Sequence, residues 1–161
     1  MIIRPATAGD AAAIWTVIGP AIRGGEVFAL DRGMSEAAAV AHWMAAHKQT
    51  FVAMDERSDV LGTYYIQPNQ AGGGRHVANA GYATAEHATG RGIARAMCAH
   101  SLDRARASGY RAMQFNFVVS TNEPAVRLWT AMGFEVVGRL PKAFEHPRLG
   151  FVDALVMSRD L

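Results

Sequence analysis

A glycine-broken turn at residues 89–94 (TGRGIA) constrains the fold of this chain more than any other stretch. Residues 76–84 before it read as extended chain, and residues 93–108 after it carry the apolar stripe of a helix. The turn therefore lies at a helix N-terminus, where the first N–H groups have no intrahelical partner and the helix dipole favours an anion. Because Gly90 and Gly92 let the backbone approach a ligand closely, the sequence predicts a phosphate-binding turn.

The residues around this turn carry a more specific pattern. The turn matches neither the lysine-containing phosphate loop nor the full dinucleotide fingerprint G-x-G-x-x-G, because Arg95 occupies the last glycine position. The segment 81–97 (GYATAEHATGRGIARAM) resembles the coenzyme-A-binding motif of the GCN5-related N-acetyltransferases, usually written Gln/Arg-x-x-Gly-x-Gly/Ala. Thr89 stands where that family prefers Gln or Arg, and Gly92 and Ala94 fill the two small positions.

Composition and charge narrow the class of protein. A chain of 161 residues that is 50% hydrophobic and 19% charged fits one domain, which we expect to span residues 1–161. The net charge of +2 and the scattered arginines give no support to nucleic-acid binding. The single cysteine, Cys98, excludes an internal disulfide and falls on the apolar stripe, so we expect a core residue. No apolar run reaches the length of a membrane span and no secretory signal begins the chain, so we expect a cytoplasmic protein without a membrane partner.

The order of the expected elements predicts an α+β fold. Gly19-Pro20 is expected to end the first helix, and Gly109 the long helix at 93–108. The long helix connects the strand 76–84 to the strand 113–119, and a crossover of this length predicts that the two strands are parallel. The remaining strands read as antiparallel neighbours, which gives a mixed, mostly antiparallel sheet of about seven strands flanked by about four helices. The expected strands are 2–4, 51–54, 60–67, 76–84, 113–119, 134–138 and 151–158, with helices at 11–18, 35–47, 93–108 and 122–132 and a loop at 139–150.

A second motif, at residues 122–134 (Asn-x-x-Ala-x-x-Leu-Trp-x-x-x-Gly-Phe), is similar to the same acetyltransferase family. With the element order, the resemblance covers nearly the whole chain. It implies acetyl-CoA as the co-substrate, no metal ion, an amine acceptor and a possible homodimer. It also implies that backbone groups of Ala83 and Thr84 meet the pantetheine arm, that the turn holds the pyrophosphate, and that Asn122 contacts the pantetheine or phosphate end. The residues expected to bind acetyl-CoA are Ala83, Thr84, Thr89, Gly90, Arg91, Gly92, Ile93, Ala94, Arg95 and Asn122.

The sequence leaves several candidates for the group that protonates the departing thiolate. The family commonly carries a tyrosine where this chain has Trp129, and an indole N–H has no usable acidity. Trp129 could position or hydrogen-bond the sulfur, although a core aromatic on the helix stripe is the simpler interpretation. Either the thiolate leaves without an acid, or Tyr82 or water supplies the proton.

Two asparagines stand inside expected strands, where asparagine is disfavoured. If Asn79 and Asn116 both face the cleft, they could hold an amine or a carboxylate; an asparagine at a bulge or an edge amide is an equal alternative. Residues 79–81 and 115–118, together with Asn122, resemble the pattern of the fungal enzymes that N-acetylate azetidine-2-carboxylate and related proline analogues. That resemblance implies that the asparagines bind the acceptor.

Three functional hypotheses follow from these residues. The first is direct acetyl transfer from acetyl-CoA to the amine of a small molecule, an amino acid or an analogue of one. The second is acetylation of a protein N-terminus or lysine, which needs an open groove, whereas the bulky residues 140–150 could close the site over a small molecule. The third is a non-catalytic acyl-CoA sensor, which Trp129 favours.

Overall fold

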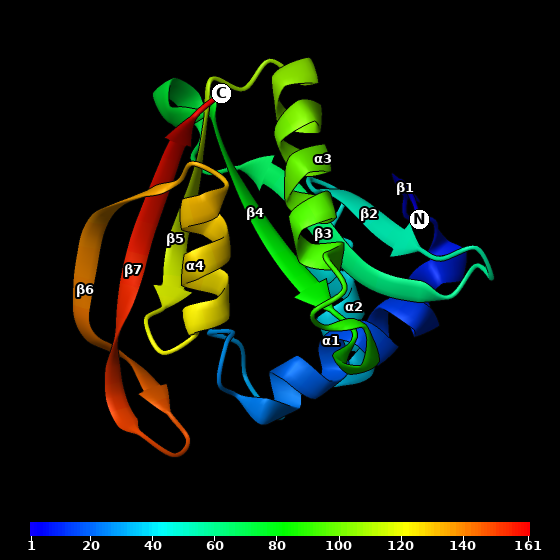
Figure 1. The fold of residues 1–161 in the computed structure, drawn as a ribbon, viewed down its shortest axis with the longest axis horizontal. Coiled ribbons are helices and arrows are strands. Elements are labelled where there is room, and N and C mark those ends of the chain that lie inside the picture. Colours follow the sequence, from blue (N-terminus) through cyan, green and yellow to red (C-terminus); the bar gives the residue numbers. More distant parts are fainter.

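The computed structural model describes all residues, 1–161, as one seven-stranded sheet with helices on both faces (Figure 1). The expected α+β class is confirmed, and so is the mixed, mostly antiparallel sheet of about seven strands flanked by about four helices. The strands are β1 (Ile2–Pro5), β2 (Gln49–Met54), β3 (Val60–Pro68), β4 (Val77–Thr84), β5 (Ala112–Val119), β6 (Glu135–His146) and β7 (Gly150–Asp160). The helices are α1 (Ala11–Gly24), α2 (Glu36–Trp43), α3 (Ile93–Ala107) and α4 (Glu123–Ala131), with short 3-10 turns η1 (Ala8–Asp10), η2 (Gly72–Gly74) and η3 (Glu86–Ala88).

One pair of neighbouring strands differs from all the others. The sheet order is β1-β2-β3-β4-β5-β7-β6, and every pair is antiparallel except β4 and β5, which are parallel as predicted. These two strands share only the pairs Val77–Ala112 and Ala78–Met113 and then separate. In Figure 1 their arrows point apart, and the blue chain that follows α1 passes below the opening. The sheet therefore has a gap with unpaired strand edges in its middle.

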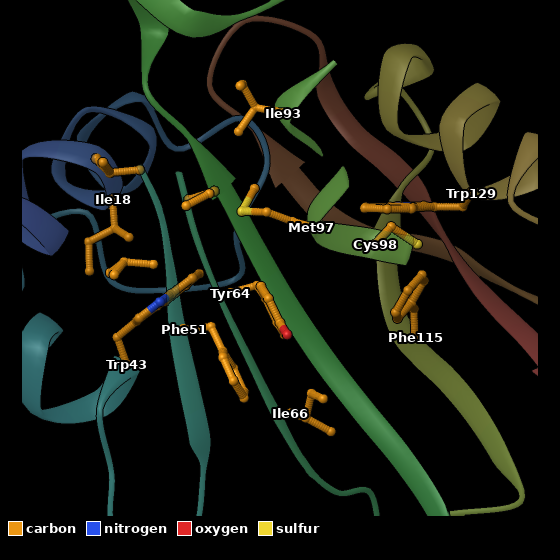
Figure 2. Packing of buried hydrophobic residues seen from close by; sticks show 14 of the residues in the cluster. Ile18, Trp43, Phe51, Tyr64, Ile66, Ile93, Met97, Cys98, Phe115 and Trp129 are labelled. Carbon is orange, nitrogen blue, oxygen red and sulfur yellow. The ribbon is translucent and has the colours of Figure 1, made fainter. Parts of the chain in front are cut away.

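The core lies on both faces of the sheet (Figure 2). On one face α3 packs with Met97 and Cys98 fully buried, as its apolar stripe predicted. Burial raises the pKa of the Cys98 thiol to about 12, so this cysteine stays protonated. On the other face lie α1 and α2, and the buried Trp43 of α2 donates from Nε1 to Thr63 Oγ1 of β3 at 3.1 Å. None of the four helices combines the length and the apolar composition that a bilayer span requires.

The prediction that Gly19-Pro20 ends the first helix is wrong. Helix α1 continues through Pro20 and ends at Gly24, where Gly25, with a φ of 67°, caps it. An interior proline destabilises a helix by about 3 kcal/mol, because it lacks an N–H and crowds the preceding turn. Ile18 and Ile22, fully buried on either side of it, each contribute about 1.5–3 kcal/mol of burial, which offsets that loss.

The second helix is shorter than predicted at its C-terminal end. Ser35 caps it as expected, with Oγ accepting from Ala38 N at 3.1 Å. The helix ends at Trp43, and side chains satisfy its last carbonyl groups: Thr50 Oγ1 donates to Trp43 O at 3.0 Å, and Lys48 Nζ donates to His42 O at 2.6 Å.

The predicted loop at 139–150 is also wrong, because β6 runs through most of it and only a tight turn separates it from β7. β6 accommodates Pro141 because proline is tolerated on an edge strand, and β6 is the edge of the sheet. Asp153 of β7 holds the irregular part of β6, since its carboxylate accepts from Arg139 Nη1 at 2.7 Å and from Lys142 N at 2.9 Å.

Candidate active site

A cavity of about 680 Å³ opens where β4 and β5 separate. Its lining comes from both strands, the glycine turn, α4 and the chain around the end of α1. The lining is mostly apolar, and its one charged side chain is Arg95. Apart from Arg91, all the residues that the sequence singled out line it: Asn79, Tyr82, Ala83, Thr84, Thr89, Gly90, Gly92, Ile93, Ala94, Arg95, Asn116, Asn122 and Trp129.

The turn before α3 has the geometry of an anion site. Gly90 and Gly92 have φ values of 74° and 80°, in the left-handed region that favours glycine. The first backbone hydrogen bond of α3 runs from Ala96 N to Gly92 O at 3.0 Å, which leaves the N–H groups before it free for a ligand. A Cβ at either glycine would meet no atom within 4 Å, so the space in front of the turn is open.

The two arginines of the turn point to different places. Arg95 lines the cavity, and its Nη1 lies 3.6 Å from Met132 Sδ. Arg91 instead lines a neighbouring hollow with Asp55 and Arg57. The structure thus brings Arg95, and not Arg91, to the main cavity.

The walls of the gap leave backbone and amide groups available. Ala83 and Thr84 pair with β3 on one side, and no residue of β5 pairs with them on the other. Asn122 caps α4, since its Oδ1 accepts from Ala125 N at 3.4 Å, while its Nδ2 has no partner within the chain. These groups can donate to and accept from an extended ligand with amide bonds.

Trp129 and Tyr82 form one wall through their rings. Trp129 is 8% exposed, and its ring centroid lies 4.9 Å from that of Tyr82 and 5.0 Å from that of Phe115. Ser101 Oγ donates to Cys98 O at 2.7 Å, so the Tyr82 hydroxyl, 2.7 Å from Ser101 Oγ, donates its proton to that oxygen. Burial raises the pKa of Tyr82 well above its usual value. Tyr82 therefore directs its proton into the core and away from the cavity.

The two strand asparagines lie on opposite sides of the gap. Asn116 lies in a bulge of β5, where its Nδ2 donates to Asn69 Oδ1 at 2.6 Å and its Oδ1 accepts from Gln114 Nε2 at 2.9 Å. Asn79 of β4 uses its Oδ1 to accept from Ala80 N at 2.8 Å. Both residues line the cavity, but Asn116 is already held by two side chains, whereas the Nδ2 of Asn79 is free.

Sequence reasoning missed one wall of the cavity. Ala21 of α1, Val27 and Phe28 after it, and Tyr65 of β3 all line it. Only Tyr65 left a signal in the sequence: Gly81 in the middle of the facing strand indicates a close approach by another group.

Sequence reasoning also missed a contact between two distant segments beside the cavity. Arg148, in the β6–β7 turn, donates from Nε and Nη2 to the Glu26 carboxylate at 3.0 and 3.2 Å. His146 is buried, and its Nδ1 accepts from the backbone N of Arg148 at 3.1 Å and of Leu149 at 3.2 Å. We name Glu26, His146 and Arg148 the clasp. It holds the chain next to Val27 and occupies the Glu26 carboxylate, which is therefore not free to act as a base.

Comparison with known proteins decides the family. The model of the acetyltransferase (GNAT) family matches residues 23–134, which include the glycine turn and both strands of the gap. The chain belongs to the GNAT family. The resemblance carried by the two sequence motifs is thereby confirmed, and so, at the level of the family, is the expected class of enzyme, an acyltransferase.

Individual GNAT proteins resemble this chain to different extents. A GCN5-related N-acetyltransferase from Kribbella flavida is 40% identical, with a TM-score of 0.95 over 99% of this chain and 97% of that one. N-acetyltransferase aca1 from Schizosaccharomyces pombe is 30% identical over 105 residues, 65% of this chain, and the match spans about half (50%) of that fungal protein's length. A phosphinothricin acetyltransferase from Sinorhizobium meliloti, solved in complex with acetyl-CoA, shares the fold at 24% identity, with a TM-score of 0.87 over 99% of this chain and 88% of that one.

Proposed function

We propose that this protein is an acetyl-CoA-dependent N-acetyltransferase that transfers the acetyl group directly to the amine of a small molecule, an amino acid or an amino-acid analogue. One observation carries the proposal: the gap between β4 and β5 and the glycine turn of α3 belong to one continuous cavity. A pantetheine arm in the gap would pair its amides with the open edge of β4, and its pyrophosphate would reach the free N–H groups of the turn. The relative from Sinorhizobium meliloti, which has the same fold, binds acetyl-CoA.

The reaction we propose needs little acid or base chemistry from the protein. The neutral amine nitrogen attacks the thioester carbon, the C–S bond breaks, and the proton that the nitrogen loses passes through water to the departing thiolate. No Asp, Glu, His or Lys side chain lines the cavity, and the Tyr82 hydroxyl is hydrogen-bonded to Ser101. Trp129 Nε1 has no partner in the chain and is not among its buried unpaired atoms, so it is free to donate a hydrogen bond to a ligand in the cavity that Trp129 lines. A thiol is acidic enough to leave as its anion.

The clasp supports a small acceptor over a peptide. It ties the β6–β7 turn to the segment after α1. The residues next to Val27 are therefore held along one side of the cavity. A peptide would need an open groove along that side, whereas a small amine needs only a closed pocket. The absence of carboxylates from the lining also disfavours polyamines and aminoglycosides, because a buried polycation requires anionic partners.

The test is release of free thiol from acetyl-CoA by the purified protein with a panel of L-amino acids, proline-ring amines, polyamines, aminoglycosides and short peptides. We expect turnover with a small amino acid or analogue. Turnover with peptides alone would replace this proposal with protein acetylation. Binding of acetyl-CoA without turnover anywhere in the panel would replace it with an acyl-CoA sensor. The homodimer and the cytoplasmic location stay predictions.

A further inference from the structure

Tyr65 occupies a place that the fold reserves for an aromatic ring. It pairs with Gly81 across the β3–β4 ladder, on the face of the sheet that α1 and α2 cover. A Cβ at position 81 would lie 2.7 Å from Tyr65 Cε1 and Cζ and 2.8 Å from its Oη. Only glycine therefore admits the ring, which lies across the backbone of β4 where Gly81 lines the cavity.

Other side chains fix the ring in this position. Trp43 meets it edge to face, with centroids 4.9 Å apart. Lys48 Nζ lies over the ring, 4.0 Å from its centroid, and donates to His42 O at 2.6 Å. The ring is thus preorganised, and a positive charge stands beside it.

The Tyr65 hydroxyl has no hydrogen-bond partner within the protein. It is also not among the buried unpaired atoms, and Tyr65 lines the cavity, so the hydroxyl is free to bind a ligand there. Burial raises the pKa of Tyr65, which keeps the hydroxyl protonated and able to donate. Asn79 is a diagonal neighbour on the same face, and its Nδ2 is free because only its Oδ1 is engaged, by Ala80 N.

The chemistry of these groups selects one class of ligand group. A phenol O–H and an amide N–H are both donors, the Lys48 ammonium lies over the Tyr65 ring, and no anionic side chain lines the cavity. Such a set is complementary to an oxygen that carries negative charge. We infer that Tyr65, beside the Asn79 already expected at the acceptor, binds the carboxylate of the acceptor and so makes the enzyme selective for amino acids over simple amines. This inference rests on the proposed function, because it names the acceptor class of the same site.

The test compares acceptors that differ only in the carboxylate: L-leucine against isopentylamine, and L-proline against pyrrolidine. We expect the wild-type protein to prefer the amino acid of each pair. Tyr65→Phe should raise the KM for the amino acid by about tenfold, because one hydrogen bond to a charged group is lost, and should leave the KM for the amine and for acetyl-CoA within about twofold. Tyr110→Phe, outside the cavity, is the matched control.

Binding measured by calorimetry on the CoA-saturated protein separates the two proposals. If the wild type binds L-leucine or L-proline without turning it over, and Tyr65→Phe loses that binding, the subsite stands and the acetyltransferase proposal fails. If the wild type acetylates these amino acids and Tyr65→Phe keeps the same preference for them, the subsite is wrong and the proposed function stands. If the wild type neither binds nor acetylates a carboxylate-bearing amine, the subsite is wrong as well.

Discussion

Glu26 and Arg148 lie 122 residues apart in the chain and meet in a two-point ion pair, with N···O distances of 3.0 and 3.2 Å. Glu26 follows α1, and Arg148 forms part of the turn between the last two strands. The pair therefore joins an N-terminal segment to a C-terminal one beside the cavity. Both side chains are partly exposed, at 41% and 72%. Such a pair contributes little to global stability, and its effect should appear in how the acceptor binds.

Arg148→Ala should therefore raise the KM for the best small acceptor by about two- to fivefold, the equivalent of the 0.4–1 kcal/mol of an exposed ion pair. The KM for acetyl-CoA should not change, because the turn and the gap are untouched. Steady-state kinetics measures both. Arg127→Ala, which removes an exposed ion pair with Glu123 on α4, is the control. An unchanged acceptor KM in Arg148→Ala would show that the clasp does not shape the pocket.

Gly92→Trp should abolish acetyl-CoA binding, with a loss of affinity of at least about 100-fold, because the indole would fill the open space in front of the free N–H groups. The left-handed φ of 80° adds about 1–2 kcal/mol of strain. Gly72→Trp controls for that strain, since Gly72 also has a positive φ, 56°, and open space, but lies away from the cavity. Calorimetry gives the affinity and circular dichroism the fold. Normal binding by Gly92→Trp would disprove the phosphate-turn assignment.

Trp129→Phe should keep kcat within about tenfold of the wild type, because an indole cannot act as a general acid and phenylalanine preserves the packing on Tyr82 and Phe115. Loss of a true general acid lowers the rate by about 10²–10⁴-fold. Rapid-quench or thiol-release kinetics with saturating acetyl-CoA distinguishes the two. A fall in that larger range would mean that the Trp129 N–H stabilises the transition state.

Asp10→Asn should reduce the free energy of unfolding at pH 7 by about 1–2 kcal/mol, because the carboxylate accepts from both Arg4 nitrogens at 2.8 Å and from Thr7 N at 2.7 Å. The bonds from Arg4, and then those from Thr7, hold the pKa of Asp10 well below its usual range. Asp103→Asn, whose side chain is 78% exposed, is the matched control and should change stability little.

The same carboxylate gives a pH dependence with a definite sign. Since its folded pKa is depressed, its contribution is complete above the unfolded value of about 3.9 and declines as the pH falls toward the folded pKa. The stability difference between the wild type and Asp10→Asn should therefore shrink below pH about 4 in urea titrations. A difference that stays constant to pH 3 would assign the effect to packing instead.

The glycine turn was predictable because its signal is local. Gly90 and Gly92 stand before a helix pattern, and both adopt the positive φ that only glycine takes readily. The parallel pairing of β4 with β5 followed from the length of the helical crossover. Local spacing and handedness thus located the cofactor side of the cavity.

One error came from taking Gly19-Pro20 as the end of the first helix, and another from expecting a loop at 139–150. Pro20 stays inside α1 because Ile18 and Ile22 are buried on both sides, and Pro141 stays in β6 because an edge strand needs no N–H there. The acceptor side of the cavity was even harder to predict from the sequence. The clasp joins residues distant in sequence, and no local pattern reports such a pair; for Tyr65, Gly81 was the only trace.

The short ladder between β4 and β5 has a further consequence for the whole molecule. Strands β1 to β4 form one antiparallel block and β5, β7 and β6 another, and between the two the sheet has only the pairs Val77–Ala112 and Ala78–Met113. A ligand bound in the gap touches both blocks and adds hydrogen bonds across their seam. Its binding free energy then adds to the unfolding free energy of the folded state. The same ligand that brings the reactive group would thus also act as a structural strand of the protein.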